Sequence, residues 1–440
     1  MREYPHTNGR LLIDGVDPHE VIKQAGTPVW IYEQRRIEAN YKRLRDAFSK
    51  HIPNLRVHYA MKANSALAVL RILEMQGAYI DAVTWNEAQL AMLAGFPAKR
   101  ILFTGVNVDN ESLEAAAKVE PTVTFDSVSQ MDRMAKIRRT LDVAIRVNPE
   151  VGAGLHAKTT TGHKGSKFGV PADDAVAAYL RAKQLGFSPV GIHAHIGSGW
   201  LTPEPFFEAA KVVCSLAKKI EKEARVKFEF IDLGGGFGVP YRPEEKELNV
   251  EAVAEGIGKI FTEHFPDGRT ALAIEPGRYL VADAGYLVTR VTAIKETPGG
   301  VYAGVDAGMN DLVRPAMYDA YHHIVPAHKM DLPFDKTYHV AGPVCESGDV
   351  FARDRKFPKL QEGDVLAILN AGAYGMTMSS NYNSRGRAAE VLVWDGQMRL
   401  IRKRETLEDL ARPQVVPDHL RQAGQFKDLT GEEPGIKMVR

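Results

Sequence analysis

The feature that most constrains this chain is a regular alternation between about residues 56 and 280. Short runs rich in β-branched residues alternate with longer stretches in which apolar residues recur at helical spacing. Eight strand-helix units of this size are what a (β/α)8 barrel requires, so we predict an α/β fold with a TIM barrel. The predicted strands end in residues 59–62, 79–81, 102–105, 124–126, 144–147, 193–196, 231–234 and 273–276.

The pattern changes after residue 285, where strand-like runs follow one another without long helical stretches. One of them turns at Asp395-Gly396, a dipeptide typical of a β-hairpin. We therefore expect a mostly-β C-terminal domain. The expected organisation is an N-terminal segment at 1–28 that joins the β-domain through a strand at 10–13, the barrel at 29–284 with a loop at 150–168 on its active face, the β-domain at 285–412, and an extension at 413–440.

Composition excludes several classes of function. The 440 residues carry 56 basic and 55 acidic side chains, and this balance leaves no broad basic surface for nucleic acid or anionic lipid. Two cysteines argue against a disulfide framework, and no stretch is typical of a signal peptide or a membrane span. We expect a cytoplasmic protein. The chain has no HExxH motif and no Cys–His spacing typical of zinc sites, so we expect no metal.

Polar residues and glycines follow the predicted strands at their C-terminal ends, the face where barrel enzymes carry their active sites. Any one of them could merely mark a strand end, but so many in register favour a functional site. These residues are Lys62, Asp81, Asp126, Arg146, His195, Gly234 to Gly236 and Glu275.

Three of these strand ends suggest specific chemistry. Lys62 leaves an apolar strand, and we expect burial to lower the pKa of its amine, which would favour a Schiff base over a merely solvated strand end. The run Asp232-Leu233-Gly234-Gly235-Gly236-Phe237-Gly238 offers backbone N–H groups to an anion such as phosphate. It does not match a dinucleotide fingerprint or a P-loop.

The third is Glu275-Pro276-Gly277-Arg278, which is open to two interpretations. The carboxylate suits a protonated ring nitrogen and the arginine a substrate carboxylate, although the two could simply form a salt bridge beside a turn. A lysine, an anion cradle, a histidine, an acid and an arginine at one barrel mouth together indicate a pyridoxal 5'-phosphate site.

The motifs resemble those of the fold-type III pyridoxal-phosphate decarboxylases, and within them the diaminopimelate decarboxylases, from about Tyr32 to Leu410. This resemblance implies a barrel of the alanine-racemase type, a C-terminal β-domain, and a head-to-tail homodimer with shared active sites. The motifs are Tyr-Ala-Met-Lys-Ala-Asn (59–64), His-Ile-Gly-Ser-Gly (195–199), the glycine run, Glu-Pro-Gly-Arg, Asp-Ala-Gly-Met-Asn (306–310), Arg-Pro-Ala-Met-Tyr (314–318), Cys-Glu-Ser-Gly-Asp (345–349) and Ala-Gly-Ala-Tyr-Gly (371–375).

The resemblance implies a role for each matching residue. Lys62 would hold the cofactor covalently, His195 would stack on its ring, and Cys345 would donate the proton that replaces carbon dioxide. Cys345 and Glu346 would come from the partner subunit. The cofactor-binding set would be Lys62, Asp81, Arg146, His195, Ser198, Gly235, Gly236, Glu275, Gly277, Arg278 and Tyr374, and the substrate-binding set Arg278, Arg314, Tyr318, Glu346 and Tyr374.

The implied reaction converts meso-2,6-diaminopimelate to L-lysine and carbon dioxide, the last step of lysine biosynthesis. A decarboxylase of D-lysine, D-ornithine or carboxynorspermidine, an amino-acid racemase, and a non-catalytic pyridoxal-phosphate-binding regulator remain alternatives. The sequence departs from the family near 82–87, where Trp85 stands in place of a glycine and affects the expected shape of the site wall.

Overall fold

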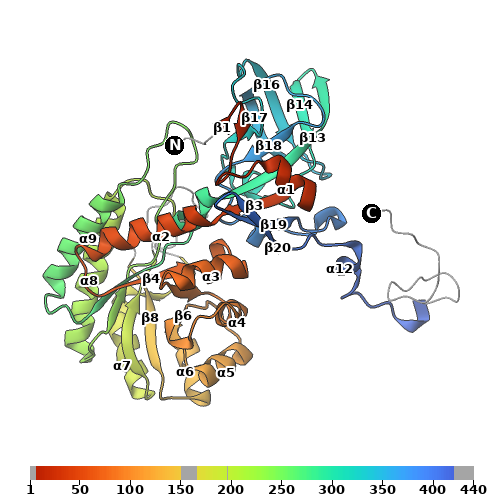
Figure 1. Ribbon diagram of the computed structural model, residues 1–440. Helices are drawn as coiled ribbons and strands as arrows, with labels where there is room; N and C mark the ends of the chain where they lie inside the picture. Colours follow the sequence, from red (N-terminus) through yellow and green to blue (C-terminus); the bar gives the residue numbers. More distant parts are fainter. Residues whose placement is uncertain (1–5, 150–165, 196, 421–440) are drawn as a thin grey trace.

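The computed structural model describes residues 6–149, 166–195 and 197–420. Eight parallel strands form a closed ring in which β4 pairs with β12 and β8 pairs with β10, which confirms the predicted barrel (Figure 1). The strands of the ring are β4 (Leu55–Ala60), β5 (Tyr79–Ala82), β6 (Ile101–Phe103), β7 (Thr122–Phe125), β8 (Asp142–Asn148), β10 (Ser188–His193), β11 (Phe230–Asp232) and β12 (Ala271–Ile274).

Helices cover the outside of the ring, and the sequence sets where several of them begin. The side chains of Thr84, Asp109, Ser127 and Asn249 accept hydrogen bonds from backbone N–H groups in the first turns of α4, α5, α6 and α9, as N-cap residues do. The helices are α2 (Gln34–Ser49), α3 (Leu67–Met75), α4 (Trp85–Leu93), α5 (Asn110–Val119), α6 (Val128–Ile137), α7 (Ala175–Gln184), α8 (Glu204–Ala224), α9 (Val250–His264) and α10 (Arg278–Val281).

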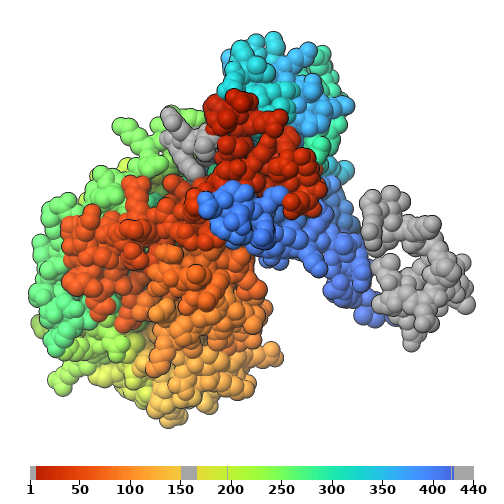
Figure 2. All heavy atoms as spheres, in the orientation of Figure 1, coloured from red at the N-terminus to blue at the C-terminus, as the bar shows by residue number. Residues whose placement is uncertain are grey.

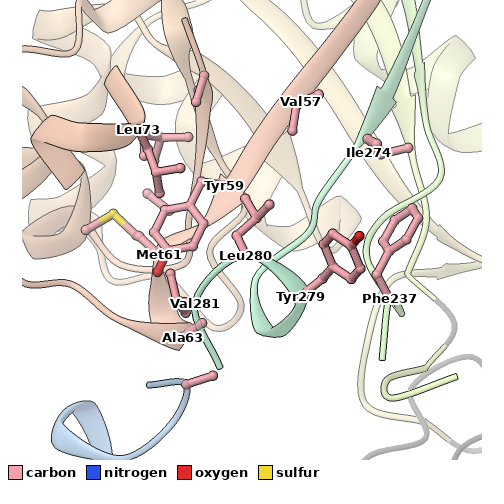
Figure 3. Packing of buried hydrophobic residues seen from close by; sticks show 14 of the residues in the cluster. Val57, Tyr59, Met61, Ala63, Leu73, Phe237, Ile274, Tyr279, Leu280 and Val281 are labelled. Carbon is pink, nitrogen blue, oxygen red and sulfur yellow. The ribbon is translucent and has the colours of Figure 1, made fainter. Parts of the chain in front are cut away.

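A dense apolar cluster supports the mouth of the barrel next to the first and last strands. Tyr59 on β4, Leu73 on α3 and Leu280 on α10 are fully buried and belong to one packed cluster (Figure 3). The hydroxyl of Tyr59 donates to the carbonyl of Asn64 at 2.8 Å and so closes the loop that carries Lys62. The position of Lys62 therefore depends on well-packed neighbours on both sides.

The C-terminal domain is built on a nine-stranded sheet that runs β17-β16-β14-β13-β3-β19-β20, with β18 and β15 attached through β13. The predicted hairpin is present, because β19 and β20 pair across Asp395-Gly396. The elements are β3 (Val29–Glu33), β13 (Gly285–Thr297), β14 (Gly300–Val305), α11 (Arg314–Tyr318), β15 (Ile324–Pro326), β16 (Lys336–Ala341), β17 (Val350–Phe357), β18 (Val365–Ile368), β19 (Ala389–Trp394), β20 (Gln397–Arg402) and α12 (Leu407–Ala411).

One predicted boundary is wrong. The sequence places residues 29–33 in the barrel, but β3 pairs with β13 and β19 in the second sheet. All five residues of β3 are buried, and such an apolar run fits any fully covered sheet equally well. The chain thus begins in the β-domain, crosses to the barrel with α2, and returns with β13.

The N-terminal segment packs on the β-domain, as Figure 2 shows for the red residues beside the blue and cyan ones. Leu11 and Ile13 are buried in the same apolar cluster as Val29 and Val391, and the backbone N–H of Leu11 donates to the carbonyl of Ala327. The expected strand at 10–13 is shorter and pairs locally. This segment contains β1 (His6–Thr7), β2 (Arg10–Leu11) and α1 (Pro18–Ala25). The short strand β9 (Val170–Pro171) follows the 150–168 loop and pairs with β8.

Two further expectations, the loop at 150–168 and the extension at 413–440, fall largely on residues 150–165 and 421–440, which lie outside the description. Within the described ranges, no helix combines the length and apolar character needed to cross a bilayer.

Two glycines join the barrel to the β-domain. A Cβ atom on Gly372 would lie 2.0 Å from the carbonyl oxygen of Val281, and one on Gly285 would lie 2.2 Å from the Cα of Gly372. Backbone N–H groups of Ala371 and Gly372 donate to Gly285 and Ala282 at 2.8 and 3.0 Å. The close approach places the segment that follows, including Tyr374, over the barrel mouth.

We expect Gly372→Ala to lower the free energy of unfolding by about 3 kcal/mol, because the added methyl group meets backbone that cannot move aside. Thermal unfolding followed by circular dichroism measures the effect. Gly299→Ala is the matched control, since its Cβ would meet its nearest neighbour at 3.7 Å. Equal unfolding temperatures for the two variants would show that the domains are not in contact at Gly372.

Candidate active site

A cavity of about 420 Å³ opens between the C-terminal rim of the barrel and the β-domain. It joins residues that are more than 170 positions apart in the sequence. Five of the predicted site residues line it: Ser198, Arg278, Arg314, Tyr318 and Tyr374. The position of the cavity is that expected for a barrel enzyme.

Lys62 lies just beyond β4 and pairs with Asp81 from β5. Its Nζ is 2.9 Å from Oδ2 of Asp81, and the hydroxyl of Thr104 donates to the other carboxylate oxygen. Burial opposes ionisation of Asp81, but Lys62 and Thr104 hold the pKa of this carboxyl at about 2. Asp81 is thus an ionised, buried partner for the amine.

The expected direction of the Lys62 pKa is wrong. Burial alone does act to lower it, but Asp81 and then Glu275 stabilise the ammonium form more strongly, so the pKa of Lys62 lies above its ordinary value. The sequence argument considered only desolvation, because the neighbouring carboxylates belong to other strands.

Glu275 at the end of β12 faces His193 at the end of β10, with Oε1 and Nε2 3.1 Å apart. Both side chains are buried, and Asp232 and His58 form a second such pair behind them at 3.4 Å. Burial and the nearby carboxylates raise the pKa of Glu275, and the Glu275 charge raises the pKa of His193 against the effect of its burial.

The buried group of four is the one arrangement among the described residues that resembles a metal site. Ligand atoms of His58, Asp232 and Glu275 lie within 4.8 Å of one another. Each of the two carboxylates already faces an imidazole nitrogen. Sequence reasoning did not predict the contact between His193 and Glu275.

The glycine loop after β11 is too crowded for side chains. A Cβ on Gly235 would lie 2.5 Å from the carbonyl oxygen of Glu275, and one on Gly236 would lie 2.8 Å from the ring of Trp200. The N–H of Gly235 donates to Nδ1 of His195 at 3.1 Å. Burial, together with Lys62 and Arg146, lowers the pKa of His195 well below its ordinary value. His195 is therefore a neutral ring with its proton on Nε2.

Two further predicted cofactor residues lie at the rim. Arg146, on β8, is buried and its guanidinium lies 4.5 Å from the ring centroid of Phe168. Gly277 precedes α10, and a Cβ there would press on Ala60 at 3.1 Å, so glycine allows the chain to pass close to β4. Neither lines the cavity, and the same is true of Lys62, Asp81, His195, Gly235, Gly236 and Glu275.

Arg278 and Arg314 meet at the hydroxyl of Tyr241, which accepts from Nη1 of each at 2.9 and 2.8 Å. Arg278 also donates to Oγ of Ser198 at 3.4 Å and lies 4.9 Å from the ring centroid of Tyr374. Tyr241 was missed because no motif marks it. A tyrosine three residues after Gly238, at the end of the glycine loop, was the available signal.

Cys345 and Glu346 are exposed and do not line the cavity of their own chain. The hydroxyl of Tyr382 donates to Oε1 of Glu346 at 2.5 Å, and the side chain of Asn383 accepts from the N–H of Cys345 at 2.9 Å. One chain therefore brings most of the predicted site together and leaves these two residues on another part of its surface.

The chain matches the family model described as "Pyridoxal-dependent decarboxylase, pyridoxal binding domain" over residues 34–282. It is 50% identical over 417 residues to a diaminopimelate decarboxylase of Methanothermobacter thermautotrophicus, covering 94% of this chain and 97% of that protein. The chain belongs to the diaminopimelate decarboxylase family.

Solved structures of related enzymes have the same fold. The M. jannaschii diaminopimelate decarboxylase in co-complex with L-lysine has a TM-score of 0.88 at 37% identity, over 95% of this chain and 99% of that one. A lysine decarboxylase from Selenomonas ruminantium has a TM-score of 0.74 at 27% identity, over 86% of this chain and 94% of that one.

The departure from the family pattern at Trp85 does not reach the cavity. Trp85 is the first residue of α4, and its ring packs against that of Phe103 with the centroids 5.9 Å apart.

Because its pKa is raised, Lys62 in cofactor-free protein should react with an amine-acylating reagent only at higher pH than the exposed Lys118. Asp81→Asn removes the stabilising charge and should move the inflection of the labelling curve to lower pH. Peptide-resolved mass spectrometry across a pH series measures both residues. Thr104→Val keeps the Asp81 charge, so Lys62 in this control should still react only at the higher pH. Reaction of Lys62 at lower pH than Lys118 would contradict a raised pKa for Lys62.

Proposed function

We propose that the protein uses pyridoxal 5'-phosphate to decarboxylate meso-2,6-diaminopimelate to L-lysine and carbon dioxide. The observation that carries this proposal is the pair of guanidinium groups, Arg278 and Arg314, in the cavity beside the strand ends of the barrel. Two arginines suit the carboxylate at the far end of diaminopimelate. They would be poorly used by an enzyme whose substrate lacks that carboxylate.

The residues at the barrel mouth fit the cofactor. Lys62 supplies the amine for covalent attachment, and the loop at Gly235 and Gly236 leaves no room for side chains where a phosphate would meet backbone N–H groups. Ser198 and the backbone at 275–278 complete this anion cradle. The neutral His195 ring offers an uncharged face for stacking. When bound, the cofactor withdraws electrons from the α-carbon as its carboxylate leaves.

The acidic residues control the charge around the cofactor. Glu275 would hold a proton at the ring nitrogen, which favours electron withdrawal, and His193 at 3.1 Å helps to keep that carboxylate ionised although it is buried. Asp81 orients the Lys62 amine through the 2.9 Å contact. Arg146 would contribute a further positive charge at the same rim.

The departing carbon dioxide must be replaced by a proton at the same carbon. We assign that proton to the thiol of Cys345, which would regain one from water, and we assign recognition of the distal ammonium to Glu346. Both side chains are exposed, and neither lines the cavity of its own chain, so we assign them to the cavity of a second chain. A cytoplasmic homodimer with shared active sites satisfies this requirement, and two unpaired cysteines suit a reducing compartment.

Two alternatives remain to be tested. A related decarboxylase would prefer D-lysine, D-ornithine or carboxynorspermidine. A non-catalytic regulator would bind the cofactor without turnover, which Lys62 paired with Asp81 and Glu275 paired with His193 argue against. A racemase on the same fold suits this site less well, because an acid at the ring nitrogen favours decarboxylation.

Purified protein should release carbon dioxide from meso-diaminopimelate with L-lysine as product, and should use D-lysine far less well. Arg314→Met removes a charged donor, so kcat/KM for meso-diaminopimelate should fall about tenfold to a hundredfold with little change for D-lysine. Arg242→Met, which removes an arginine at the cavity edge, is the control. Preference for D-lysine by the wild-type enzyme would overturn the substrate assignment.

Shared active sites predict complementation between inactive variants. Lys62→Ala lacks cofactor attachment and Cys345→Ala lacks the proton donor, so mixing the two proteins should restore partial activity through hybrid dimers that contain one intact site. Subunit exchange is verified by native mass spectrometry of differently tagged chains. Absence of recovery in mixtures with proven hybrids would contradict a partner-supplied Cys345.

A further inference from the structure

Tyr241 occupies a position in the cavity that neither its sequence context nor its family match explains. It follows the glycine loop and lies between the two arginines assigned to the substrate carboxylate. Its backbone N–H donates to Oε2 of Glu245 at 2.8 Å, and its ring meets His322 edge-on at 5.3 Å. Both the backbone and the ring of Tyr241 are therefore held in place.

The hydroxyl oxygen of Tyr241 accepts two hydrogen bonds, and its hydrogen is still free to donate one. A phenol oxygen has two lone pairs and one hydrogen. Both lone pairs are used, because Arg278 and Arg314 donate to the oxygen at 2.9 and 2.8 Å. The hydrogen cannot return to either guanidinium, since arginine has no acceptor. The contacts of the described residues assign this hydrogen no acceptor, and the hydroxyl lies at the wall of the cavity.

The Tyr241 hydroxyl also reduces the repulsion between Arg278 and Arg314. Two guanidinium groups that converge on one point repel each other, and the repulsion is stronger where water is scarce. The negative end of the phenol dipole between them offsets part of that repulsion. Burial opposes ionisation of Tyr241, yet the two arginines bring the pKa of its hydroxyl below the ordinary value, which shows how strongly they act on this oxygen.

We propose that Tyr241 is a specificity-determining residue that spaces Arg278 and Arg314 and donates its hydroxyl hydrogen to the distal carboxylate of the substrate. A carboxylate placed against the pair would then receive hydrogen bonds from two guanidiniums and one phenol. This inference rests on the proposed function, because it concerns the carboxylate that diaminopimelate carries and lysine-type diamines lack. Loss of the hydroxyl should weaken recognition of that group alone.

The test compares two ligands that differ in the distal carboxylate. L-lysine retains it and cadaverine does not. Isothermal titration of the cofactor-loaded enzyme should give a dissociation constant for L-lysine that rises tenfold or more in Tyr241→Phe, while that for cadaverine stays within twofold. In steady state, kcat/KM for meso-diaminopimelate should fall by a similar factor, with that for D-lysine unchanged.

Tyr321→Phe is the matched control. Tyr321 lines the same cavity and also lies beside two arginines, with the guanidiniums of Arg242 and Arg355 at 4.5 and 3.6 Å from its ring centroid. Its loss of a hydroxyl should leave the discrimination between L-lysine and cadaverine intact. A second variant, Tyr241→Leu, removes hydroxyl and ring together and should show the same selective loss.

Three results would overturn the proposal. Equal weakening of both ligands would mean general damage to the cavity, unchanged binding of L-lysine would mean that the hydroxyl makes no contact with the carboxylate, and tighter binding of L-lysine would mean that Tyr241 competes for the arginines. The wild-type enzyme separates this failure from that of the proposed function. If it releases no carbon dioxide from meso-diaminopimelate, the reaction itself is wrongly assigned.

Discussion

The pairing of the first and last strands of the barrel is the contact on which the rest of the site depends. Leu272 and Ile274 of β12 align with Leu55 and Val57 of β4, and the ring closes there. Closure brings Glu275 close enough to Lys62 to raise its pKa, although more than 200 positions separate the two. Without it, the strand ends would be separate polar residues. With it, they share one water-poor volume in which each charge acts on the others.

The second domain supplies what the barrel rim lacks. Tyr374 lies over the barrel mouth because the chain between β18 and β19 passes against Gly285 and the end of α10. Arg314 comes from α11 of the same domain and lines the cavity with it. The N–H of Tyr374 donates to the carbonyl of Ala63 at 2.8 Å, next to the lysine itself. The predicted cofactor-binding residues therefore lie mostly in the barrel, and the predicted substrate-binding residues lie on both sides of the junction. Changes at the junction should affect substrate recognition more than cofactor attachment.

Sequence reasoning succeeded where a property repeats along the chain and failed where it depends on partners in space. Eight strand ends could be aligned because the alternation is regular, and Lys62, His195 and Glu275 follow from it. β3 was assigned to the wrong sheet, because an apolar run of five residues does not specify which strands it pairs with. The pKa of Lys62 and the contacts of Tyr241 were missed for the same reason. Each depends on charged groups of elements distant in the sequence, which pattern and spacing do not specify.

The charged residues that would bind the two ends of the distal group of the substrate lie in two different places on each chain. The cationic half, Arg278 and Arg314, lines the cavity, whereas Glu346 is exposed elsewhere and held by Tyr382. With the proposed roles, a single chain would bind the distal carboxylate but would not contact the distal ammonium. Because Cys345 directly precedes Glu346, the proposed proton donor and the proposed ammonium-binding residue would enter the site together. In the proposed dimer, assembly would then supply catalysis and half of the specificity together, while cofactor binding would persist in a dissociated chain.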